Sequence, residues 1–301
     1  MFVLAHLSDL HFAKRPRLAE LAGKRGLGFI NWHRGRKHIH RTEVLDAITD
    51  DLKTIGADHI AVTGDLVNFS LESEYALARA WLDRLGPANA VTAIPGNHDA
   101  YVAAAQNGPV RHWAEYMSGD DRSSHFPFIR HRAPVTLIGL SSAVPTGPFM
   151  ATGELGEGQL SQLAKALGLT HGSFRIVLIH HPPESPPNRH LRRLIDGVSF
   201  RQVLATYGAE LVIHGHDHTR SLTWLDGPQK SIPVVGAPSA SARVAHHNEN
   251  RGGYNVFQID GTPGAWQCVM IAREYGEDGK VAEVLRQDLL SYQHLPQRSR
   301  A

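Results

Sequence analysis

The chain has a single cysteine, Cys268, among its 301 residues. One thiol cannot form a disulfide within the chain, so the fold depends on its own hydrophobic core, and a reducing compartment is expected. No run of 18 or more apolar residues occurs, which argues against a membrane-spanning helix. The N-terminus lacks a basic segment followed by a long apolar core, so we expect no signal peptide. These absences predict a cytoplasmic protein.

Net charge is also small, at +2, but it is unevenly distributed along the chain. Residues 13–41 contain nine lysines and arginines and one glutamate, a net charge of +8, which leaves −6 for the remainder. The chain has 20 histidines. Because histidine is the commonest metal ligand in proteins, this number favours a metal site without locating it.

Apolar runs alternate with helical patterns over the first 220 residues, which predicts an α/β fold with a buried sheet. The expected strands are residues 2–7, 59–63, 90–94, 135–140, 175–179 and 210–213, and the expected helices lie near 42–55, 72–85, 157–168 and 199–207. After residue 220 the runs become shorter and alternating. We expect these runs to form antiparallel strands that complete a second sheet, at 221–225, 232–235, 254–259 and 265–271.

Polar residues of similar types follow five of the apolar runs. They are Ser-Asp-Leu-His at 8–11, Gly-Asp at 64–65, Gly-Asn-His-Asp at 96–99, His-His-Pro-Pro at 180–183 and His-Gly-His-Asp-His at 214–218. Taken alone, Asp9 and His11 could form a metal half-site, an acid–base pair or a solvated strand end. Since ligands bind where the carboxyl ends of parallel strands share one edge, we expect the five clusters to converge.

Aspartate, asparagine and histidine without thiolates suit a pair of divalent metal ions. The expected ligands of one ion are Asp9, His11 and His218, and those of the other ion are Asn97, His180 and His216. Asp65 is expected to bridge the two ions. Gly64, Gly96 and Gly215 stand beside these residues and would allow the backbone to approach closely. Manganese is the favoured metal, and iron, zinc and cobalt also accept such ligands.

In this order, the five motifs resemble the calcineurin-like metallophosphoesterase superfamily over about residues 1–240, with every expected ligand position filled. The resemblance implies a four-layer α/β/β/α sandwich and a dinuclear centre with the division of ligands given above. Within the superfamily, the chain is most similar to bacterial phosphodiesterases of the cyclic-nucleotide type and their phospholipase C-like relatives. We expect one domain over residues 1–290, a cap insertion at about 13–41 and a C-terminal tail at about 290–301.

The implied chemistry is hydrolysis of a phosphodiester, which is anionic and a poor electrophile. Two metal ions about 3.5–4 Å apart can clamp its oxygens and generate hydroxide near neutral pH, and this hydroxide would attack phosphorus in line with the leaving oxygen. By resemblance, His98 contacts the phosphate and stabilises the transition state, or protonates the leaving oxygen. Asp99 is expected to accept an N–H of the His98 ring and so to fix its tautomer.

Other polar residues beside the motifs are expected to be structural. His181 adjoins a predicted ligand but is expected to pack or to form hydrogen bonds. His214 precedes the last motif's glycine and is expected to be a buried strand residue, and Asp217 is expected to point away from the centre.

The basic segment at 13–41 is an insertion relative to compact members of the superfamily. Its glycines, Gly23, Gly26 and Gly28, predict two short helices or a helical hairpin rather than one rod. Because the segment leaves the first strand directly after His11, it should cap the metal centre. It could be a solvated cap packed on the domain, an element that contacts anionic lipid, or a nucleic-acid contact.

A substrate rim is expected from this cap and from residues 184–197. Its candidate residues are Trp32, Arg36, Arg189 and His190. The favoured substrate is a phospholipid headgroup diester, cleaved in the manner of a phospholipase C, and the main alternative is a cyclic nucleotide. An alternative of another class is a catalytically silent module that binds lipid or nucleic acid.

The expected partners follow from this interpretation. The basic cap allows peripheral contact with an anionic membrane surface at the inner face, and no specific nucleic-acid partner is expected. The sequence does not indicate an oligomeric state.

Overall fold

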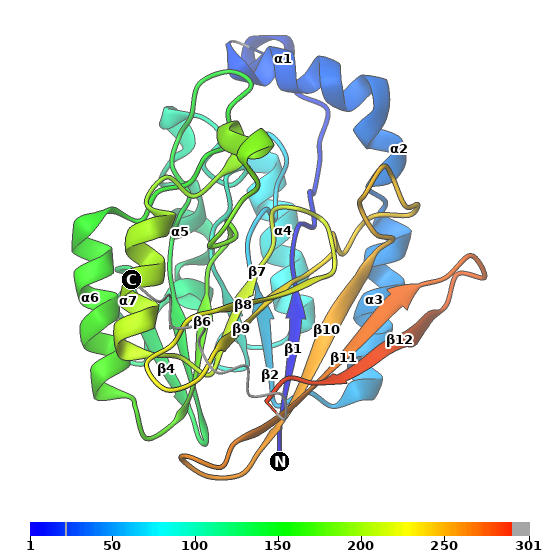
Figure 1. The fold of residues 1–301 in the computed structure, drawn as a ribbon. Coiled ribbons are helices and arrows are strands. Elements are labelled where there is room, and N and C mark those ends of the chain that lie inside the picture. Colours follow the sequence, from blue (N-terminus) through cyan, green and yellow to red (C-terminus); the bar gives the residue numbers. More distant parts are fainter. Residues whose placement is uncertain (22, 291–301) are drawn as a thin grey trace.

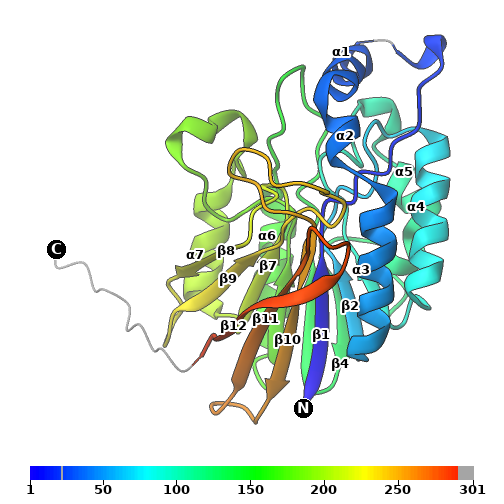
Figure 2. The same ribbon diagram turned by 90° about the vertical axis from the view of Figure 1, so that its right-hand side faces the viewer.

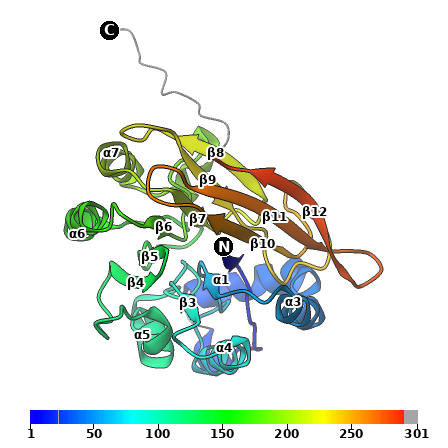
Figure 3. The ribbon, with the colours of Figure 1, turned by 90° about the horizontal axis from the view of Figure 1, so that it is seen from below.

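The computed structural model of the chain describes residues 1–21 and 23–290. Two six-stranded sheets lie face to face, with helices on the outer side of each (Figure 1). Figure 3 shows the four layers end-on, which confirms the expected α/β/β/α sandwich. Apart from residue 290, the expected C-terminal tail lies outside the described residues. Within the described part, no helix combines the length and the apolar character needed to cross a membrane.

The first sheet has the strand order β12-β11-β10-β1-β2-β3. Its strands are β1 (Phe2–Leu7), β2 (His59–Val62), β3 (Val91–Ala93), β10 (Gly253–Asp260), β11 (Gln267–Tyr275) and β12 (Val281–Asp288). Strands β1, β2 and β3 are parallel, and β10 pairs with β1 in the antiparallel direction. Helices α3 (Thr42–Ile55) and α4 (Glu72–Leu85) cover this sheet, and α3 buries Val44, Leu45, Ile48 and Leu52 on one face.

The second sheet has the order β4-β5-β6-β7-β9-β8. Its strands are β4 (Phe128–Arg132), β5 (Val135–Gly139), β6 (Phe174–Leu178), β7 (Leu211–His214), β8 (Ser221–Leu225) and β9 (Ile232–Gly236). Along β6, Ile176 and Leu178 enter the core shared with the first sheet, whereas Val177 packs with α6 (Gly156–Leu169) and α7 (Gly197–Tyr207). Both faces of β6 are buried, which explains its continuous apolar run.

The strands after residue 220 are divided between the two sheets, which corrects the expectation that they complete only the second. Strands β8 and β9 join the second sheet, where β9 runs parallel to β7. Strands β10, β11 and β12 extend the first sheet beyond β1. This arrangement covers the apolar strand β1, which would otherwise be an exposed sheet edge. Two of the four edge strands, β4 and β12, were not expected, because their sequences lack a clear apolar alternation.

The insertion forms a cap above the carboxyl end of β1 (Figure 1). A 3₁₀ turn (Leu18–Glu20) is followed by one helical run, made of α1 (Lys24–Asn31), a π-helical segment (Trp32–Arg36) and α2 (Lys37–Ile39). Of the expected glycine breaks, the one at Gly23 is present, where φ is 60° and α1 begins, whereas those at Gly26 and Gly28 do not occur. A Cβ atom at Gly28 would lie 2.5 Å from the Tyr101 hydroxyl, so this glycine lets α1 pack closely against Tyr101.

Short helical elements complete the connections between the strands. They are α5 (Gly108–Trp113) and 3₁₀ turns at Ala103–Ala105, Ala114–Met117 and Pro187–Arg192. The last of these lies at the same end of the molecule as the cap (Figure 2).

Candidate metal centre

All seven predicted metal ligands follow strand ends and are buried. In chain order they are Asp9 and His11 after β1, Asp65 after β2, Asn97 after β3, His180 after β6, and His216 and His218 after β7. Three of these strands belong to the first sheet and two to the second. The carboxyl ends of these strands lie at the same end of the sandwich, beneath the cap (Figure 2), and the seven residues follow them there.

Five of the seven adopt a left-handed backbone conformation, with φ between 52° and 72°: Asp9, His11, Asp65, His216 and His218. This region is sparsely populated by residues other than glycine, and each such residue costs about 1–3 kcal/mol. Only nine non-glycine residues of the described part have positive φ, so more than half of this backbone strain is concentrated here. The surrounding fold holds these turns so that the side chains face one another.

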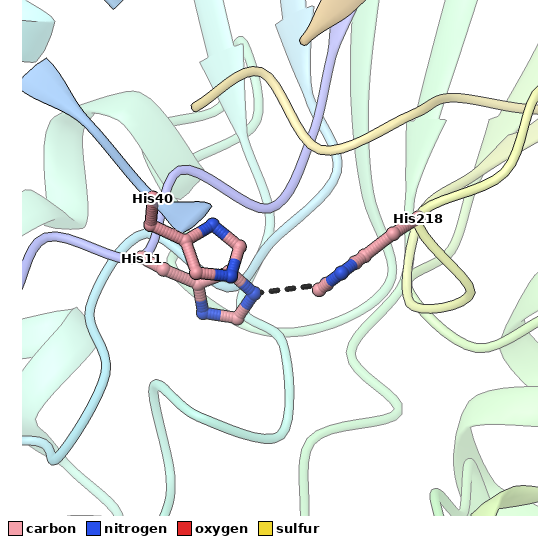
Figure 4. A group of neighbouring side chains, drawn as sticks. All are labelled: His11, His40 and His218. Carbon is pink, nitrogen blue, oxygen red and sulfur yellow. Dashed lines mark hydrogen bonds between the residues drawn. The ribbon is translucent and has the colours of Figure 1, made fainter. Parts of the chain in front are cut away.

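Asp9, His11 and His218 form the first group of facing ligand atoms. Asp9 Oδ1 lies 3.2 Å from His218 Nε2 and 3.8 Å from His11 Nε2. The two Nε2 atoms are 2.9 Å apart (Figure 4). Asp9 Oδ1 is buried and makes no hydrogen bond within the described structure. A carboxylate oxygen and two imidazole nitrogens that converge in this way fit a divalent cation.

Asn97, His180 and His216 form the second group. Asn97 Oδ1 lies 3.1 Å from His180 Nε2 and 2.9 Å from His216 Nδ1. Asp65 Oδ1 lies 3.5 Å from His180 Nε2. Asp65 also belongs to two sets whose ligand atoms lie within 4.8 Å of one another, one with Asp9 and His180, the other with His11 and His98. Its position between the two groups suits a carboxylate that bridges two ions.

Glycines permit this close packing of ligands, as the sequence suggested. A Cβ atom at Gly96 would lie 2.3 Å from Asp65 Oδ1, and one at Gly215 would lie 2.5 Å from Asp9 Oδ2. Any larger residue at either position would displace a predicted ligand.

The electrostatics keep the two carboxylates ionised. Burial alone would raise the pKa of Asp9 and of Asp65, but neighbouring histidines lower both below the ordinary value. Conversely, burial would lower the pKa of His180 and His218, but Asp65 and Asp9 respectively raise each to about 9. In the absence of a cation, the site is thus a set of buried carboxylate–imidazolium pairs.

His98 and Asp99 occupy different environments. The His98 ring lines the cavity, and its Nδ1 lies 2.7 Å from the carbonyl oxygen of Asn68. Asp99 was expected to accept a ring N–H from His98, but its two oxygens accept the backbone N–H groups of Val67 and Gly96. The carbonyl of Asn68 is therefore the partner that sets the His98 tautomer, and Asp99 shapes the loops around it.

Two residues near the site were missed from the sequence. His40, at the end of the cap, lies beside His11 (Figure 4), with ring centroids 4.6 Å apart. Its Nδ1 lies 2.8 Å from Ser241 Oγ. Glu249 Oε2 lies 3.2 Å from His218 Nδ1 and so orients that ring. His40 was missed because it lies in a run of basic residues, and Glu249 was missed because its loop carries no recognisable motif.

The neighbouring histidines behave as structural residues. The ring nitrogens of His181 contact Ser142 Oγ at 2.7 Å and the Ala151 carbonyl oxygen at 3.1 Å. His214 is buried at the end of β7, with its Nδ1 2.9 Å from the carbonyl oxygen of Gly215.

The four predicted rim residues are dispersed. Trp32 packs against Phe69, with ring centroids 5.9 Å apart, and Arg189 donates to Asp217 at 2.5 Å. His190 is exposed, and the side chain of Arg36 lies outside the described part.

A cavity of about 500 Å³ lies over the predicted ligands. Its lining includes residues of the motifs, of the cap and of the later loops, namely Asp65, Asn97, His98, Gly35, Ile39, His40, Arg192, His216, His218, His246, His247 and Glu249. The cap therefore borders the centre, as expected. Arg192, rather than Arg189, brings a guanidinium group to the rim.

Comparison with known proteins supports the same interpretation. The family model described as calcineurin-like phosphoesterase matches residues 2–220. A dimetal phosphatase from Danio rerio has a similar structure, with a TM-score of 0.60, 13% identity, and coverage of 94% of this chain and 98% of its own. A purple acid phosphatase from yellow lupin (Lupinus luteus) seeds gives a TM-score of 0.61 at 12% identity, over 95% of this chain and 53% of its own. At these identities the likeness shows a shared fold.

A putative 5'-nucleotidase from Staphylococcus aureus is also similar, with a TM-score of 0.51, 13% identity, and coverage of 96% of this chain and 54% of its own. No match to the chain was found among curated proteins.

Proposed function

The chain belongs to the calcineurin-like phosphoesterase family, and from that premise we propose that it is a metal-dependent phosphodiesterase. The observation that carries the proposal is the convergence of seven residues with oxygen or nitrogen ligand atoms, with Asp65 between the two groups. Two divalent cations bound there would polarise the phosphoryl oxygens and lower the pKa of a water nucleophile. The donor set contains only carboxylate, amide and imidazole groups, which suits manganese, iron, zinc or cobalt, with manganese favoured.

His98 is the candidate proton donor of the reaction. Because its Nδ1 faces a carbonyl oxygen, that nitrogen carries a hydrogen atom. The second proton of a charged His98 is then on Nε2, where it can be donated to a phosphoryl or leaving-group oxygen. The backbone N–H of His98 donates to Asp65 Oδ1 at 2.7 Å, so one residue both holds the predicted bridging carboxylate and faces the substrate.

The protein's own side chains add little positive charge to that of the two cations, which supports a diester rather than a monoester as the substrate. Among the described residues that line the cavity, Arg192 is the one permanently charged cation, and no lysine lines it. A diester carries one negative charge near neutral pH, whereas a monoester carries close to two. Among diesters, we favour a phospholipid headgroup over a cyclic nucleotide, because the segment at the rim carries a net charge of +8, which suits an anionic lipid surface.

The test compares two chromogenic substrates with the metal content of the protein. Purified protein loaded with manganese should hydrolyse bis(p-nitrophenyl) phosphate faster than p-nitrophenyl phosphate and should contain two metal ions per chain. Asp65→Asn should lose at least 100-fold in kcat/KM and most of the metal. Asp226→Asn, which changes an exposed aspartate between β8 and β9, is the matched control and should retain both.

Two results would decide against the proposal, and a third would change only its favoured substrate. Faster hydrolysis of the monoester would assign the chain to the phosphatases. Hydrolysis of 3',5'-cyclic AMP but not of phosphatidylglycerol would select the cyclic nucleotide. Bound metal without hydrolysis of any phosphoester would indicate a silent binding module.

A further inference from the structure

A second cavity, of about 660 Å³, lies directly beside the metal cavity. One wall is the cap helix α1, with Lys24, Leu27, Gly28 and Ile30, and the other is the loop of residues 148–151. Four residues line both cavities: Asn97, His98, Ala151 and Arg192. A molecule in this second cavity, which we call the cap groove, would therefore contact His98 and other residues that also line the metal cavity.

Large apolar side chains are exposed along the cap groove. Leu27 is 44% exposed, Ile30 49%, Met150 37% and Phe149 83%. Phe149 also has φ of 63°, a conformation that is strained for an aromatic residue. Contiguous exposed apolar surface of this kind commonly marks a ligand-binding site. A backbone that keeps a phenyl ring outside the core supports that interpretation.

Specific contacts hold the two walls in place. Lys24 Nζ donates to Thr146 Oγ1 at 2.7 Å and to the Met150 carbonyl oxygen at 3.1 Å, which ties α1 to the opposite loop. Gly28 allows α1 to rest on Tyr101. The Tyr101 ring in turn stacks on His98, with centroids 5.2 Å apart and planes at 13°. The groove is thus built against the side chain that faces the substrate.

We propose that the cap groove binds one alkyl or acyl chain of an amphiphilic phosphoester whose phosphoryl group lies in the metal cavity. The inference rests on the proposed function. The apolar walls match a hydrocarbon chain, and Arg192, which lines both cavities, matches the anionic group to which the chain is attached. The base of a cyclic nucleotide can stack on a ring such as Phe149, but a cyclic nucleotide has no hydrocarbon chain to lie along Leu27 and Ile30.

A homologous series of substrates tests the groove. Methyl, butyl and octyl p-nitrophenyl phosphate present the same reacting bond and differ only in chain length. Each methylene that becomes buried contributes about 0.8 kcal/mol, roughly fourfold in affinity. We expect kcat/KM to rise at least tenfold from the methyl to the octyl ester, measured below the critical micelle concentration.

Variants locate the effect within the molecule. In Leu27→Ser and Phe149→Ser, the ratio of kcat/KM for the octyl ester to that for the methyl ester should fall at least fivefold. Leu169→Ser is the matched control, because Leu169 is 83% exposed at the end of α6 and lines none of the cavities described here. A kcat/KM that does not rise with chain length would overturn the proposal. An octyl-to-methyl ratio that falls equally in the control variant would also overturn it.

A binding measurement separates failure of the groove from failure of the proposed function. Isothermal titration of dodecylphosphonate and methylphosphonate does not depend on hydrolysis, and the longer compound should bind at least tenfold more tightly. Hydrolysis of the methyl ester with equal binding of both phosphonates would overturn the groove but not the function. A dimer in light scattering that Leu27→Ser dissociates, together with equal binding, would assign the groove to a second copy of the chain and overturn the proposal.

Discussion

His180 and His218 hold protons that a bound cation would have to displace. Burial opposes their charge, but Asp65 and Asp9 raise the pKa of each to about 9, so both are protonated at pH 7.5 in the metal-free protein. A metal ligand has to be neutral imidazole, and metal binding should therefore release about two protons per chain at pH 7.5. Isothermal titration in buffers with different ionisation enthalpies measures this number.

The direction of the pH dependence follows from the same pKa values. Metal affinity should rise as the pH increases from 6.5 towards 9, and proton release should disappear above about pH 10. An affinity that does not change over this range would contradict the assignment of His180 and His218 as ligands.

His40 extends the predicted metal site into the cap. Its ring lies beside His11 (Figure 4), and its contact with Ser241 fixes it there. Residues that support metal ligands commonly contribute 10–100-fold in metal affinity. We expect His40→Ala to weaken metal binding by about that factor, measured by competition with a chromophoric chelator. His38→Ala, at an exposed histidine of the same helical run, is the control, and equal affinities in the two variants would exclude the role.

At the scale of elements, the sequence predicts the strands and helices that apolar periodicity marks. It misses features that depend on contacts between residues far apart in the chain. The run FVLAHL forms β1 with the expected bounds, and α3 ends where Gly56 adopts φ of 63°. The polar residues that follow the parallel strands predict the candidate metal ligands, because strand ends at one sheet edge have to be near one another. The continuous cap helix was not predictable from its own glycines, since Gly28 is required by Tyr101, a residue 73 positions away.

Helix α4 carries a buried carboxylate, Glu74, that holds the segments after β1 and after β2 by hydrogen bonds. Glu74 accepts the backbone N–H groups of Lys14 at 3.0 Å, Phe69 at 2.8 Å and Leu71 at 3.2 Å. Each buried donor that loses its acceptor costs about 1–3 kcal/mol. We expect Glu74→Ala to lower the free energy of unfolding by about 3 kcal/mol in urea denaturation. Glu157→Ala, at an exposed position in the first turn of α6, should change it by less than about 0.5 kcal/mol.

At the scale of the whole molecule, each of the two sheets contributes part of the predicted ligand set. The first sheet supplies Asp9, Asp65 and Asn97, and the second supplies His180 and His216. Neither sheet alone presents a complete set of ligands, so the predicted centre exists only when the sandwich is assembled. The cap then closes the same edge from above (Figure 1).

Because the predicted ligands come from both sheets, we expect bound metal to stabilise the whole folded chain against unfolding. A cation that binds only the folded chain stabilises it by about 2.7 kcal/mol at a concentration 100 times its Kd. In a protein of this size, 1 kcal/mol corresponds to about 2–4 °C, so removal of metal with a chelator should lower Tm by about 5–10 °C. Hydrogen exchange should accelerate in the loops after β1, β2, β3, β6 and β7, whereas β5 should be little affected. In Asp65→Asn, manganese should produce no shift, and a Tm that is the same with and without metal in the unaltered protein would show that the cation does not join the two sheets.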